Sequence, residues 1–367
     1  MKKVLIAITT MFGGGAERVV SVWSDKLVSQ GYDVSLLLYG REEGEYPIND
    51  NVKVYTVAET YAEYKKLGYF TRLKKMRKLV KEIAPDVIIN FLPRMQIWMM
   101  MATFGMRVPK IETVRVSPWQ VCENSKGELF LWRRCFRKSK AIIVQTQEQA
   151  EYFSKKLQKK CVVISNPIDE KYQKSFKTDY SSKIKNFVSA GRITEQKNYP
   201  LMIQSFANAC ETNKDIKLSI YGVGEVDYTK KLQDLINECG VSNNIKLMGR
   251  TSKMAEVLKN ADAFIMTSDY EGMPNALLEA MATGLVCIST NCRTGPKDMI
   301  EHGKSGFLAK VGNVEDVADK IKEVLALDYE CATKIGQSAR QKIFETCSEE
   351  MSLKKLVDII EKVGKNK

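Results

Sequence analysis

Residues 2–23, KKVLIAITTMFGGGAERVVSVW, contain the pattern that decides the fold. An aliphatic run leads into three glycines, after which apolar residues recur at helical spacing at Val19, Val20 and Trp23. The aliphatic run is typical of a strand buried on both faces, and the later spacing is typical of a helix with one buried face. The stretch therefore predicts a strand, a glycine-rich turn and a helix, which together begin a βαβ unit.

The same alternation continues through the chain in two series. Strand-like runs occur first in DVSLLLYG, DVIINFL, KIETVRV, AIIVQT and VVISNP, and then in FVSAGR, LSIYG, IKLMG, AFIMTS and VCIST. Short runs of this kind, bounded by Gly, Pro or Asp and separated by helical patterns, fit parallel strands covered by helices on both faces. We therefore expect an α/β protein with two doubly wound, Rossmann-like domains.

A polar stretch separates the two series. Residues 166–186, NPIDEKYQKSFKTDYSSKIKN, lack helical periodicity and are typical of a linker. We predict a first domain over residues 1–180 and a second over residues 181–347. Residues 348–367 predict an amphipathic helix, whose apolar face holds Leu353, Leu356, Val357 and Ile360. Loops beyond the carboxyl ends of the strands, from both domains, are the expected ligand site.

The composition of the 367 residues excludes several classes of protein. Hydrophobic residues make up 44% of the chain, and only 22 glycines and 9 prolines occur, so neither a fibrous nor a disordered chain is expected. No apolar run reaches about 18 residues and no signal-peptide cleavage pattern is present, which predicts a cytosolic protein. His302 is the single histidine, and none of the nine cysteines form a C-x-x-C motif. We therefore expect reduced thiols, no metal site and no Ser-His-Asp triad.

The net positive charge of the chain is confined to its first half. Residues 1–183 carry 32 Lys and Arg against 19 Asp and Glu, whereas residues 184–367 carry 25 of each. Two basic stretches stand out, TRLKKMRKLVKEI at 71–83 and FLWRRCFRKSK at 130–140. The first has a helical stripe of Leu73, Met76, Val80 and Ile83. We predict contact with an anionic membrane surface. The alternatives are core packing of the stripe and general solubility, while no nucleic-acid-binding signature is present.

Two loops have the composition of phosphate-binding turns. Gly13, Gly14 and Gly15 precede a helix whose N-terminal amides attract anions, although the spacing is not G-x-G-x-x-G, and a purely structural turn is the alternative. In the second half, Arg192 ends a strand and Lys197 stands just before a helix. A guanidinium and an ammonium suit a diphosphate, the alternative being two solvated loop charges. The glycine-bearing YGVGE at 221–225 predicts only a turn.

A pair of carboxylates is the most specific feature. In EGMPNALLEAMATG, residues 271–284, Glu271 precedes a helix that begins around Asn275, and Glu279 lies one turn inside it. One carboxylate can accept two hydrogen bonds from a sugar diol and the other from a ribose, and amides near Met273 to Ala276 can receive phosphate or sugar oxygens. The alternatives are a helix-dipole partner for Glu271 and a solvated charge for Glu279. The apolar neighbours of Glu279 favour burial, and a buried charge needs a partner.

On these residues the chain resembles the retaining glycosyltransferases of the GT-B fold, family 4, a group that includes bacterial polysaccharide and lipid-linked sugar transferases. The matching strings are GGGAER, SAGRITEQKN, EGMPNALLE and GPKDMIEHGKSGFL, and the resemblance extends nearly end to end. It implies that Arg192, Lys197 and Glu271 are catalytic, the two cations binding the donor diphosphate and Glu271 contacting the donor sugar. It also implies that the last helix packs back on the first domain and that no metal is needed.

The resemblance further implies a set of donor-binding residues. Glu279 would hold the nucleotide ribose, and the segment 247–250 would lie near the base. The donor-binding set is Gly14, Gly15, Gly249, Arg250, Met273, Pro274, Asn275, Ala276 and Glu279.

The chain departs from the family at one point. Many members carry a histidine near the reacting sugar in the first domain, whereas His302 lies in a predicted loop of the second half. The candidate replacements are Arg94, Arg115 and Ser117, which together with Gly13 form the predicted acceptor set. No residue is assigned as a general base.

The expected reaction is transfer of a hexose or hexosamine from a UDP-sugar to a saccharide carried on a polyprenyl diphosphate, with the anomeric configuration retained. It would take place at the cytoplasmic face of the membrane. Two alternatives remain: a sugar-nucleotide epimerase of the same fold, which needs no acceptor, and a non-enzymatic basic module that binds a membrane surface.

Overall fold

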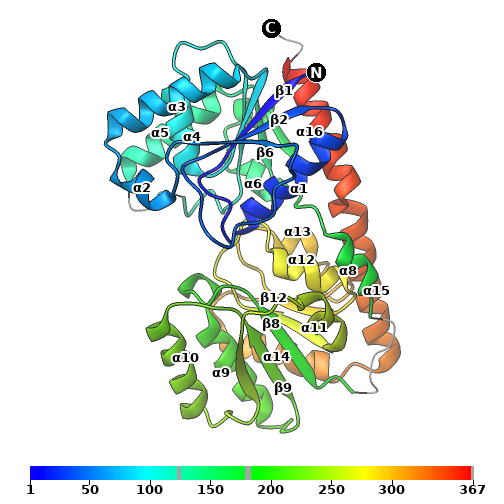
Figure 1. Ribbon diagram of the computed structural model, residues 1–367. Helices are drawn as coiled ribbons and strands as arrows, with labels where there is room; N and C mark the ends of the chain where they lie inside the picture. The colour runs from blue at the N-terminus through cyan, green and yellow to red at the C-terminus, as the bar shows by residue number, and fades with distance from the viewer. Residues whose placement is uncertain (122–124, 178–182, 365–367) are drawn as a thin grey trace. The chain divides into compact units, whose positions relative to one another are not determined.

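The computed structural model describes residues 1–121, 125–177 and 183–364, which form two compact units (Figure 1). Unit 1 comprises Met1–Pro167 and Glu349–Lys367, and unit 2 comprises Ile168–Ser348. Each unit is built around one parallel sheet covered by helices, so the predicted pair of doubly wound domains is confirmed.

Within the described part of unit 1, seven parallel strands lie in the order β3-β2-β1-β4-β5-β6-β7. The strands are β1 (Lys3–Ala7), β2 (Asp33–Leu38), β3 (Lys53–Thr56), β4 (Val87–Asn90), β5 (Lys110–Thr113), β6 (Ala141–Val144) and β7 (Cys161–Val163). The helices are α1 (Gly15–Ser29), α2 (Tyr61–Lys66), α3 (Tyr69–Ile83), α4 (Pro93–Ala102), α5 (Lys126–Lys138), α6 (Gln147–Glu151), α7 (Lys155–Gln158) and α16 (Glu349–Gly364).

Alternating residues of β1 serve opposite faces of this sheet. Val4 and Ile6 pack in a core cluster with residues of α1 and α16, whereas Leu5 and Ala7 pack in a second cluster with residues of α3 and α4. Successive side chains of a strand point to opposite faces, so a continuous aliphatic run fills both clusters at once.

Within the described part of unit 2, six parallel strands lie in the order β10-β9-β8-β11-β12-β13. The strands are β8 (Asn186–Ala190), β9 (Lys217–Tyr221), β10 (Ile245–Gly249), β11 (Ala263–Met266), β12 (Val286–Thr290) and β13 (Phe307–Ala309). The helices are α8 (Glu170–Lys174), η1 (Glu195–Lys197, a 3₁₀ turn), α9 (Tyr199–Cys210), α10 (Val226–Glu238), α11 (Met254–Asn260), α12 (Asn275–Ala282), α13 (Pro296–Met299), α14 (Val314–Leu325) and α15 (Tyr329–Cys347).

The same alternation operates in unit 2. Ala263 and Ile265 of β11 pack with residues of α9 and α14, whereas Phe264 and Met266 pack with residues of α12 and α15. The predicted runs become strands in both units. The edge strands β3 and β13 are additional to the predicted set, and β13 is only three residues long.

The C-terminal helix α16 belongs to unit 1, as the family resemblance implies (Figure 1). Leu356 and Ile360 are buried in the cluster that also contains Trp23 of α1. The Trp23 indole donates a hydrogen bond to Ser352 Oγ at 3.1 Å, and Lys2 Nζ lies 2.9 Å from Glu361 Oε2. The apolar face of α16 therefore completes one side of the first core.

The division between the units differs from the predicted one. The predicted boundary between residues 180 and 181 lies outside the described residues, and the units instead divide after Pro167 and before Glu349. The segment predicted as a linker contains α8, and Ile168 and Tyr172 are buried in the core of unit 2. Two apolar residues one turn apart are too few to produce a detectable helical period, which explains the difference.

The apolar stripe of the first basic stretch is part of the core. Met76, Val80 and Ile83 of α3 are buried in one cluster of unit 1, and Leu73 packs against it. This finding corrects the prediction that the stripe faces a membrane, because only the basic side of α3 remains at the surface. In the second stretch, Phe130 of α5 is 59% exposed, whereas Trp132 and Phe136 are buried.

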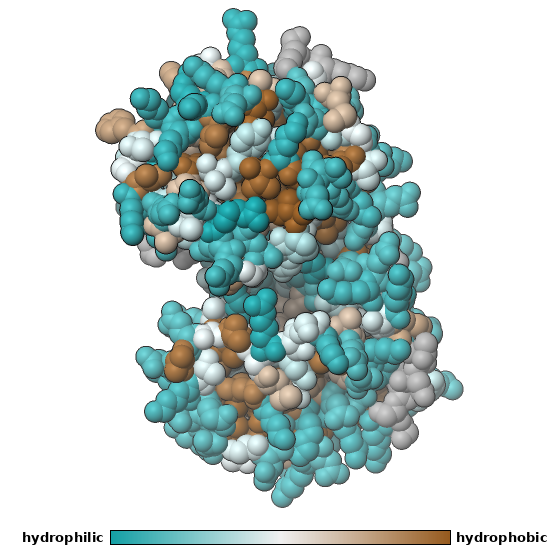
Figure 2. Space-filling model, viewed as in Figure 1, coloured by the Kyte–Doolittle hydropathy of each residue, from teal (hydrophilic) through white to brown (hydrophobic). Residues whose placement is uncertain are grey.

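No helix among the described residues combines the length and the apolar character needed to cross a membrane. Figure 2 shows that hydrophilic residues cover most of the visible face, with hydrophobic residues in separate patches. Every cysteine in the described ranges is free, in agreement with the prediction of reduced thiols.

Candidate active site

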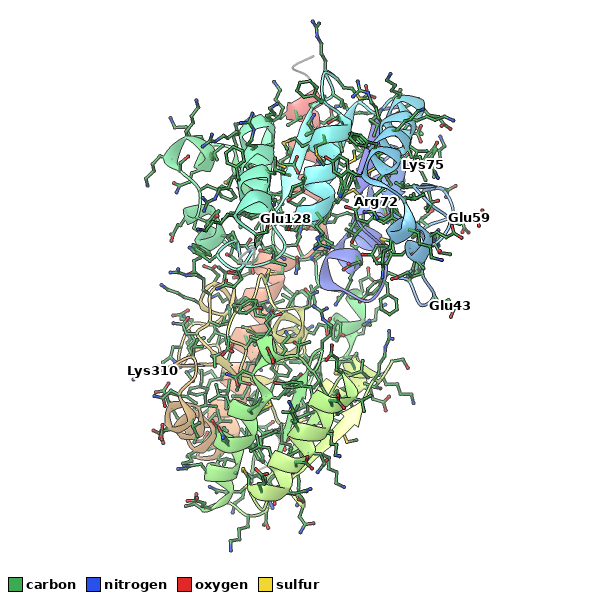
Figure 3. All side chains as sticks on the ribbon, turned by 90° about the vertical axis from the view of Figure 1, so that its left-hand side faces the viewer. Glu43, Glu59, Arg72, Lys75, Glu128 and Lys310 are labelled. Atoms are coloured by element: carbon green, nitrogen blue, oxygen red, sulfur yellow. The ribbon has the colours of Figure 1, made fainter. Side chains whose placement is uncertain are left out.

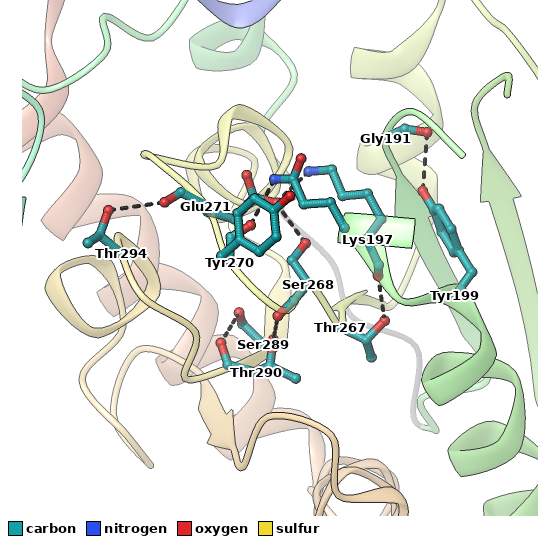
Figure 4. Close-up of polar contacts among 11 residues, drawn as sticks. Gly191, Lys197, Tyr199, Thr267, Ser268, Tyr270, Glu271, Ser289, Thr290 and Thr294 are labelled. Carbon is teal, nitrogen blue, oxygen red and sulfur yellow. Dashed lines mark hydrogen bonds and ion pairs between the residues drawn. The ribbon is translucent and has the colours of Figure 1, made fainter. Parts of the chain in front are cut away.

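Two neighbouring strands of unit 2 carry the predicted catalytic residues at their carboxyl ends, and Figure 4 shows two of them, Lys197 and Glu271. Arg192 and Lys197 follow β8, and Glu271 follows β11, which lies beside β8 in the sheet. In the order of the sheet, β9 and β10 lie beyond β8 on one side, and β12 and β13 lie beyond β11 on the other. It is therefore the topological switch point, where open α/β sheets bind ligands.

Lys197 and Glu271 form an ion pair at this switch point. The Lys197 ammonium lies 2.6 Å from Glu271 Oε1, and the two side chains are only 17% and 9% exposed. Ser268 Oγ donates a second hydrogen bond to the same oxygen at 2.7 Å. Among the described residues, Glu271 Oε2 accepts no hydrogen bond. One oxygen thus fixes the carboxylate and the other is left to accept from a ligand.

Hydrogen bonds across the sheet hold the two loops together (Figure 4). Thr267 Oγ1 donates to the carbonyl oxygens of Lys197 at 3.2 Å and Asn198 at 2.9 Å. Gln196 Nε2 donates to the Tyr270 carbonyl at 2.8 Å. The Asn198 side chain caps α9 by accepting from the Leu201 amide. These bonds place Lys197 and Glu271 on a fixed backbone, which favours preorganised electrostatics.

The turn before α13 supports Glu271 from the other side. The Glu271 amide donates to the Arg293 carbonyl at 3.1 Å, and Thr294 Oγ1 donates to the Gly272 carbonyl at 2.6 Å. Gly295 has a φ of 106°, and a Cβ there would lie 2.7 Å from Pro274 Cδ. Only glycine fits this contact, so the GPKDM string serves to hold the segment in front of α12.

Arg192 is positioned by a segment that the sequence assigned only to a turn. The Gly191 amide donates to the Tyr221 carbonyl, and the Ile193 amide donates to the Val223 carbonyl. A Cβ at Gly222 would overlap the Gly191 carbonyl oxygen. The glycines of YGVGE therefore let two strand exits pack against each other, and the exposed Arg192 projects from this junction. Gly222 and Gly224, two glycines just after a strand, are the sequence signal that could have indicated this close packing.

Helix α12 begins at Asn275, as predicted, and has no side-chain cap. Its first-turn amides lack acceptors within the helix and can receive ligand oxygens. Glu279 is 9% exposed, so it is a buried carboxylate and not a solvated one. The donor-binding candidates Met273, Pro274 and Ala276 lie in and just before this first turn.

The two remaining donor candidates of unit 2, Gly249 and Arg250, lie at and just after the end of β10. Gly249 has a φ of 71°, and its carbonyl accepts from the Gly222 amide at 2.9 Å. Gly249 and the exposed Arg250 therefore adjoin the turn that positions Arg192.

A buried thiol also lies near Glu271. Burial raises the pKa of the Cys292 thiol to about 12, and the Glu271 charge adds to the shift. This thiol stays protonated.

The glycine turn of unit 1 has the predicted geometry. Gly13 has a φ of 64°, Gly14 is the N-cap of α1 without a side-chain hydrogen bond, and Gly15 begins the helix. A Cβ at Gly14 would overlap the carboxylate of Glu17, which is buried. An acidic group of the chain itself therefore lies against the turn that the sequence predicted to approach phosphate.

The acceptor candidates of unit 1 differ in their surroundings. Arg94 is exposed at the start of α4, whereas Ser117 is buried and its hydroxyl donates to Gln120 within a turn. The Ser117 hydroxyl therefore makes a hydrogen bond within its own turn. His302 lies in a loop, as predicted, and its Nδ1 accepts from the Leu308 amide at 3.0 Å.

Arg115 follows β5 and is the unusual member of the acceptor set. Its guanidinium is 4.5 Å from the Trp23 ring centroid and 5.0 Å from that of Phe91. The side chain is 8% exposed, Nη1 donates to Asn166 Oδ1 at 3.2 Å, and Nε and Nη2 have no partner. Burial lowers the pKa of Arg115 to about 9. A buried cation with two unpaired nitrogens is a candidate anion-binding group.

Replacing Arg115 with methionine is expected to stabilise the protein by about 1–3 kcal/mol and to lower its activity. At pH 7 the guanidinium is charged in the folded and unfolded states, so the full cost of burying it is present; that cost decreases only as the pH rises above about 9. Asn166 Oδ1 keeps a bond from Gln145 Nε2 in the variant. Chemical denaturation measures the change.

The matched control is Arg137→Met, which removes an exposed arginine of the same unit and should change stability by less than about 0.5 kcal/mol. A loss of stability in Arg115→Met would show instead that stacking on Trp23 and Phe91 outweighs the cost of burial.

The structure thus distributes the predicted residues between the units. In unit 2 it brings together Arg192, Lys197, Glu271 and the start of α12, with Gly249 and Arg250 beside the Gly222 turn. Gly13, Gly14, Gly15, Arg94, Arg115 and Ser117 all lie in unit 1.

Two family models match adjoining parts of the chain. The model of Glycosyltransferase Family 4 matches residues 13–172, and the model of Glycosyl transferases group 1 matches residues 170–342. The first match lies almost wholly in unit 1 and the second contains all the residues of the switch-point site.

Two similar proteins align with nearly the whole chain. The amylovoran biosynthesis glycosyltransferase AmsD of Erwinia amylovora is 24% identical, over 98% of this chain and 100% of the relative. The N-acetylgalactosamine-N,N'-diacetylbacillosaminyl-diphospho-undecaprenol 4-alpha-N-acetylgalactosaminyltransferase of Campylobacter jejuni is 25% identical, over 94% of this chain and 96% of the relative.

A solved structure supports the fold. The Anabaena protein Alr3699/HepE, in a crystal structure with UDP and glucose, superposes with a TM-score of 0.79 at 18% identity, covering 98% of this chain and 100% of that chain. Two parallel-sheet units, a switch-point site with paired charges and two adjoining family matches lead to one conclusion: the chain belongs to the glycosyltransferases of the GT-B fold.

Proposed function

We propose that this glycosyltransferase moves a hexose or hexosamine from a UDP-sugar to a saccharide carried on a polyprenyl diphosphate, with retention of the anomeric configuration. The observation that carries the proposal is the ion pair of Lys197 and Glu271 at the switch point, beside the uncapped start of α12. The Campylobacter relative is named for an undecaprenyl-diphosphate-linked substrate, and the Anabaena structure holds UDP and glucose, which supports both substrate classes.

In this proposal the leaving UDP is met by fixed positive charge. Lys197 gives one ammonium hydrogen to Glu271 and has two others for a phosphate oxygen, while Arg192 can bind two oxygens at once. Because these groups and the α12 amides stand on hydrogen-bonded loops, they stabilise the developing charge without reorganising. The diphosphate then needs no metal ion for neutralisation.

Glu271 and Glu279 have separate roles in the proposed complex. Glu271 Oε2 accepts from donor sugar hydroxyls and orients the sugar, and Glu279 accepts from the ribose diol. The two residues are eight positions apart, one before α12 and one within it, so they do not act as an opposed glycosidase-like pair. In this proposal Glu271 orients the donor sugar and does not act as a nucleophile that forms a covalent intermediate.

We further propose that the protein binds peripherally at the cytoplasmic face of the membrane, where its acceptor would be found. Phe70 is 82% exposed at the start of α3 and Phe130 is 59% exposed on α5, and both helices are rich in Lys and Arg. Exposed aromatic rings among cations suit an anionic lipid surface, at about 1 kcal/mol per cation near it.

A panel of nucleotide sugars tests the donor assignment through thermal stability. A uridine diphosphate sugar at 100 times its dissociation constant should stabilise the protein by about 2.7 kcal/mol and raise its melting temperature, while guanosine and adenosine donors should not. The shift should persist in EDTA, because cations of the chain hold the diphosphate. A shift with guanosine or adenosine donors alone would overturn the uridine assignment, and NMR of the product anomer tests retention.

A further inference from the structure

Unit 1 contains a pocket of about 480 Å³ at the carboxyl ends of its central strands. Thr9 and Tyr39 follow β1 and β2, and Arg94 lies in the first turn of α4, the helix after β4. Helices α2, α3 and α5 complete the wall, so every lining residue belongs to unit 1. Carboxyl ends of parallel strands are the usual ligand edge of such a sheet.

Three tyrosines form one wall of this pocket. The rings of Tyr39 and Tyr64 stack with centroids 4.1 Å apart, and the Tyr61 ring lies 6.1 Å from that of Tyr64, within 11° of parallel. The hydroxyl oxygens of Tyr39 and Tyr64 are buried and make no hydrogen bond of ordinary geometry. Burial raises the pKa of both phenols, so both stay protonated and can donate.

Cations lie against the tyrosine wall. The Arg72 guanidinium is 4.6 Å from the Tyr64 ring centroid, and Lys65 Nζ is 4.6 Å from that of Tyr61. Arg72 Nη2 donates to the Lys65 carbonyl at 2.6 Å, whereas its buried Nε has no partner. Arg94 is the third cation of the lining. Among the described residues, none of the three forms an ion pair, and Glu128 is the single acid of the lining.

The buried polar atoms of this pocket without a hydrogen bond of ordinary geometry are two phenol hydroxyls, which can donate or accept, and a guanidinium nitrogen, which can only donate. Three cations add positive charge around them. This surplus of cations favours a ligand with several negatively charged acceptor oxygens, which is the chemistry of a phosphate or diphosphate.

Aromatic residues extend from the pocket to the surface. The Trp98 and Tyr69 rings, both in the lining, lie 4.9 Å apart, and the Tyr69 and Phe70 rings lie 5.5 Å apart. Phe70 is 82% exposed. The indole of Trp98 offers an apolar face to a sugar ring, and the path to Phe70 offers apolar contact to a chain leaving the pocket.

We propose that this pocket binds the phosphorylated end of the saccharide acceptor, with Arg72, Lys65 and Arg94 around the phosphate oxygens. This inference rests on the proposed function and assigns the acceptor to named residues of unit 1. The same chemistry occurs in a lipid-linked saccharide diphosphate and in a soluble sugar phosphate, and the aromatic path to Phe70 favours the lipid-linked source.

The test compares two probes on the full chain by calorimetry: an N-acetylglucosamine diphosphate with a short isoprenyl chain, and N-acetylglucosamine 1-phosphate. Arg72→Gln should weaken binding of the isoprenyl probe by about 10- to 100-fold, because a charge-assisted hydrogen bond is lost. Tyr64→Phe removes one buried hydroxyl with little change in shape and should weaken the same binding. Stronger binding of the isoprenyl probe supports the lipid-linked source, and equal binding of both probes overturns that choice.

The matched control is Lys75→Gln, which removes an exposed cation of the same helix that does not line the pocket (Figure 3). Its probe binding should stay within about twofold of wild type. Binding of UDP, measured by thermal shift, should be unchanged in all three variants and shows that each is folded. Unchanged probe binding in both Arg72→Gln and Tyr64→Phe overturns the pocket assignment. If the protein binds the isoprenyl probe but no nucleotide sugar, the proposed function is contradicted, whereas the assignment of the pocket is still supported.

Discussion

Replacing Lys197 with alanine is expected to lower the turnover number by about 10²- to 10³-fold, as for the loss of one preorganised donor at a developing anion. Two effects combine in this variant. The departing diphosphate loses a cation, and Glu271, only 9% exposed, loses the ammonium that lies 2.6 Å from its carboxylate. Release of UDP from a UDP-sugar, followed under saturating acceptor, measures the change.

The matched control for this prediction is Lys304→Ala. It removes the lysine of an exposed ion pair with Glu301 in the same unit, 3.1 Å long, and should leave turnover unchanged. Glu271→Gln keeps the shape of the side chain while removing its charge, and combining it with Lys197→Ala completes a double-mutant cycle. If Lys197→Ala turns over as fast as Lys304→Ala, the ammonium has no part in stabilising the leaving group.

Replacing Asp262 with alanine is expected to cost about 3–5 kcal/mol of folding free energy. Asp262 Oδ2 accepts from the backbone amides of Lys185 and Asn186 at 3.1 and 2.9 Å, and Oδ1 lies 3.3 Å from Lys177 Nζ. The Lys177 and Asp262 side chains are 7% and 6% exposed. Alanine at 262 thus leaves a buried ammonium without its carboxylate and two amides without their acceptor. Chemical denaturation of the full chain measures the loss.

Asp215→Ala is the control for this prediction, because Asp215 is 85% exposed in a 3.7 Å pair with Lys185. Its effect should be below about 1 kcal/mol. The double variant Lys177→Met with Asp262→Leu should recover part of the loss, since an apolar pair avoids the cost of burying charge. A loss in Asp262→Ala no greater than in Asp215→Ala would show that the buried pair does not anchor the segment before β8.

Local pattern was enough to predict much of the architecture. A strand run such as KVLIA fills two core clusters by simple alternation, and helical spacing places Val19, Val20 and Trp23 of α1 in the core. The start of α12 at Asn275 and the burial of Glu279 also follow from local composition. In each case the relevant property, which face of an element is apolar, is contained within a few consecutive residues.

Contacts between distant segments could not be predicted in this way. The basic stretch of α3 has the same periodicity whether its stripe meets a membrane or a core, and the tertiary structure puts it in the core. Lys177 stands in a polar stretch that resembles a linker, yet its partner Asp262 is 85 residues away. Nothing near Arg115 in the sequence shows that two of its nitrogens are buried without partners.

The sequence by itself determined the succession of strands and helices, the family and the residue types of the site, because these depend on local periodicity and on motif spacing. Tertiary structure alone decided which groups meet: Lys197 with Glu271 across 74 residues, the turn at Gly222 with Gly191, and Tyr39 with Arg94 in the pocket of unit 1. The physical reason is that a charge or hydroxyl acquires its role from the atoms packed around it, and those atoms arrive only when strands far apart in the chain align in one sheet.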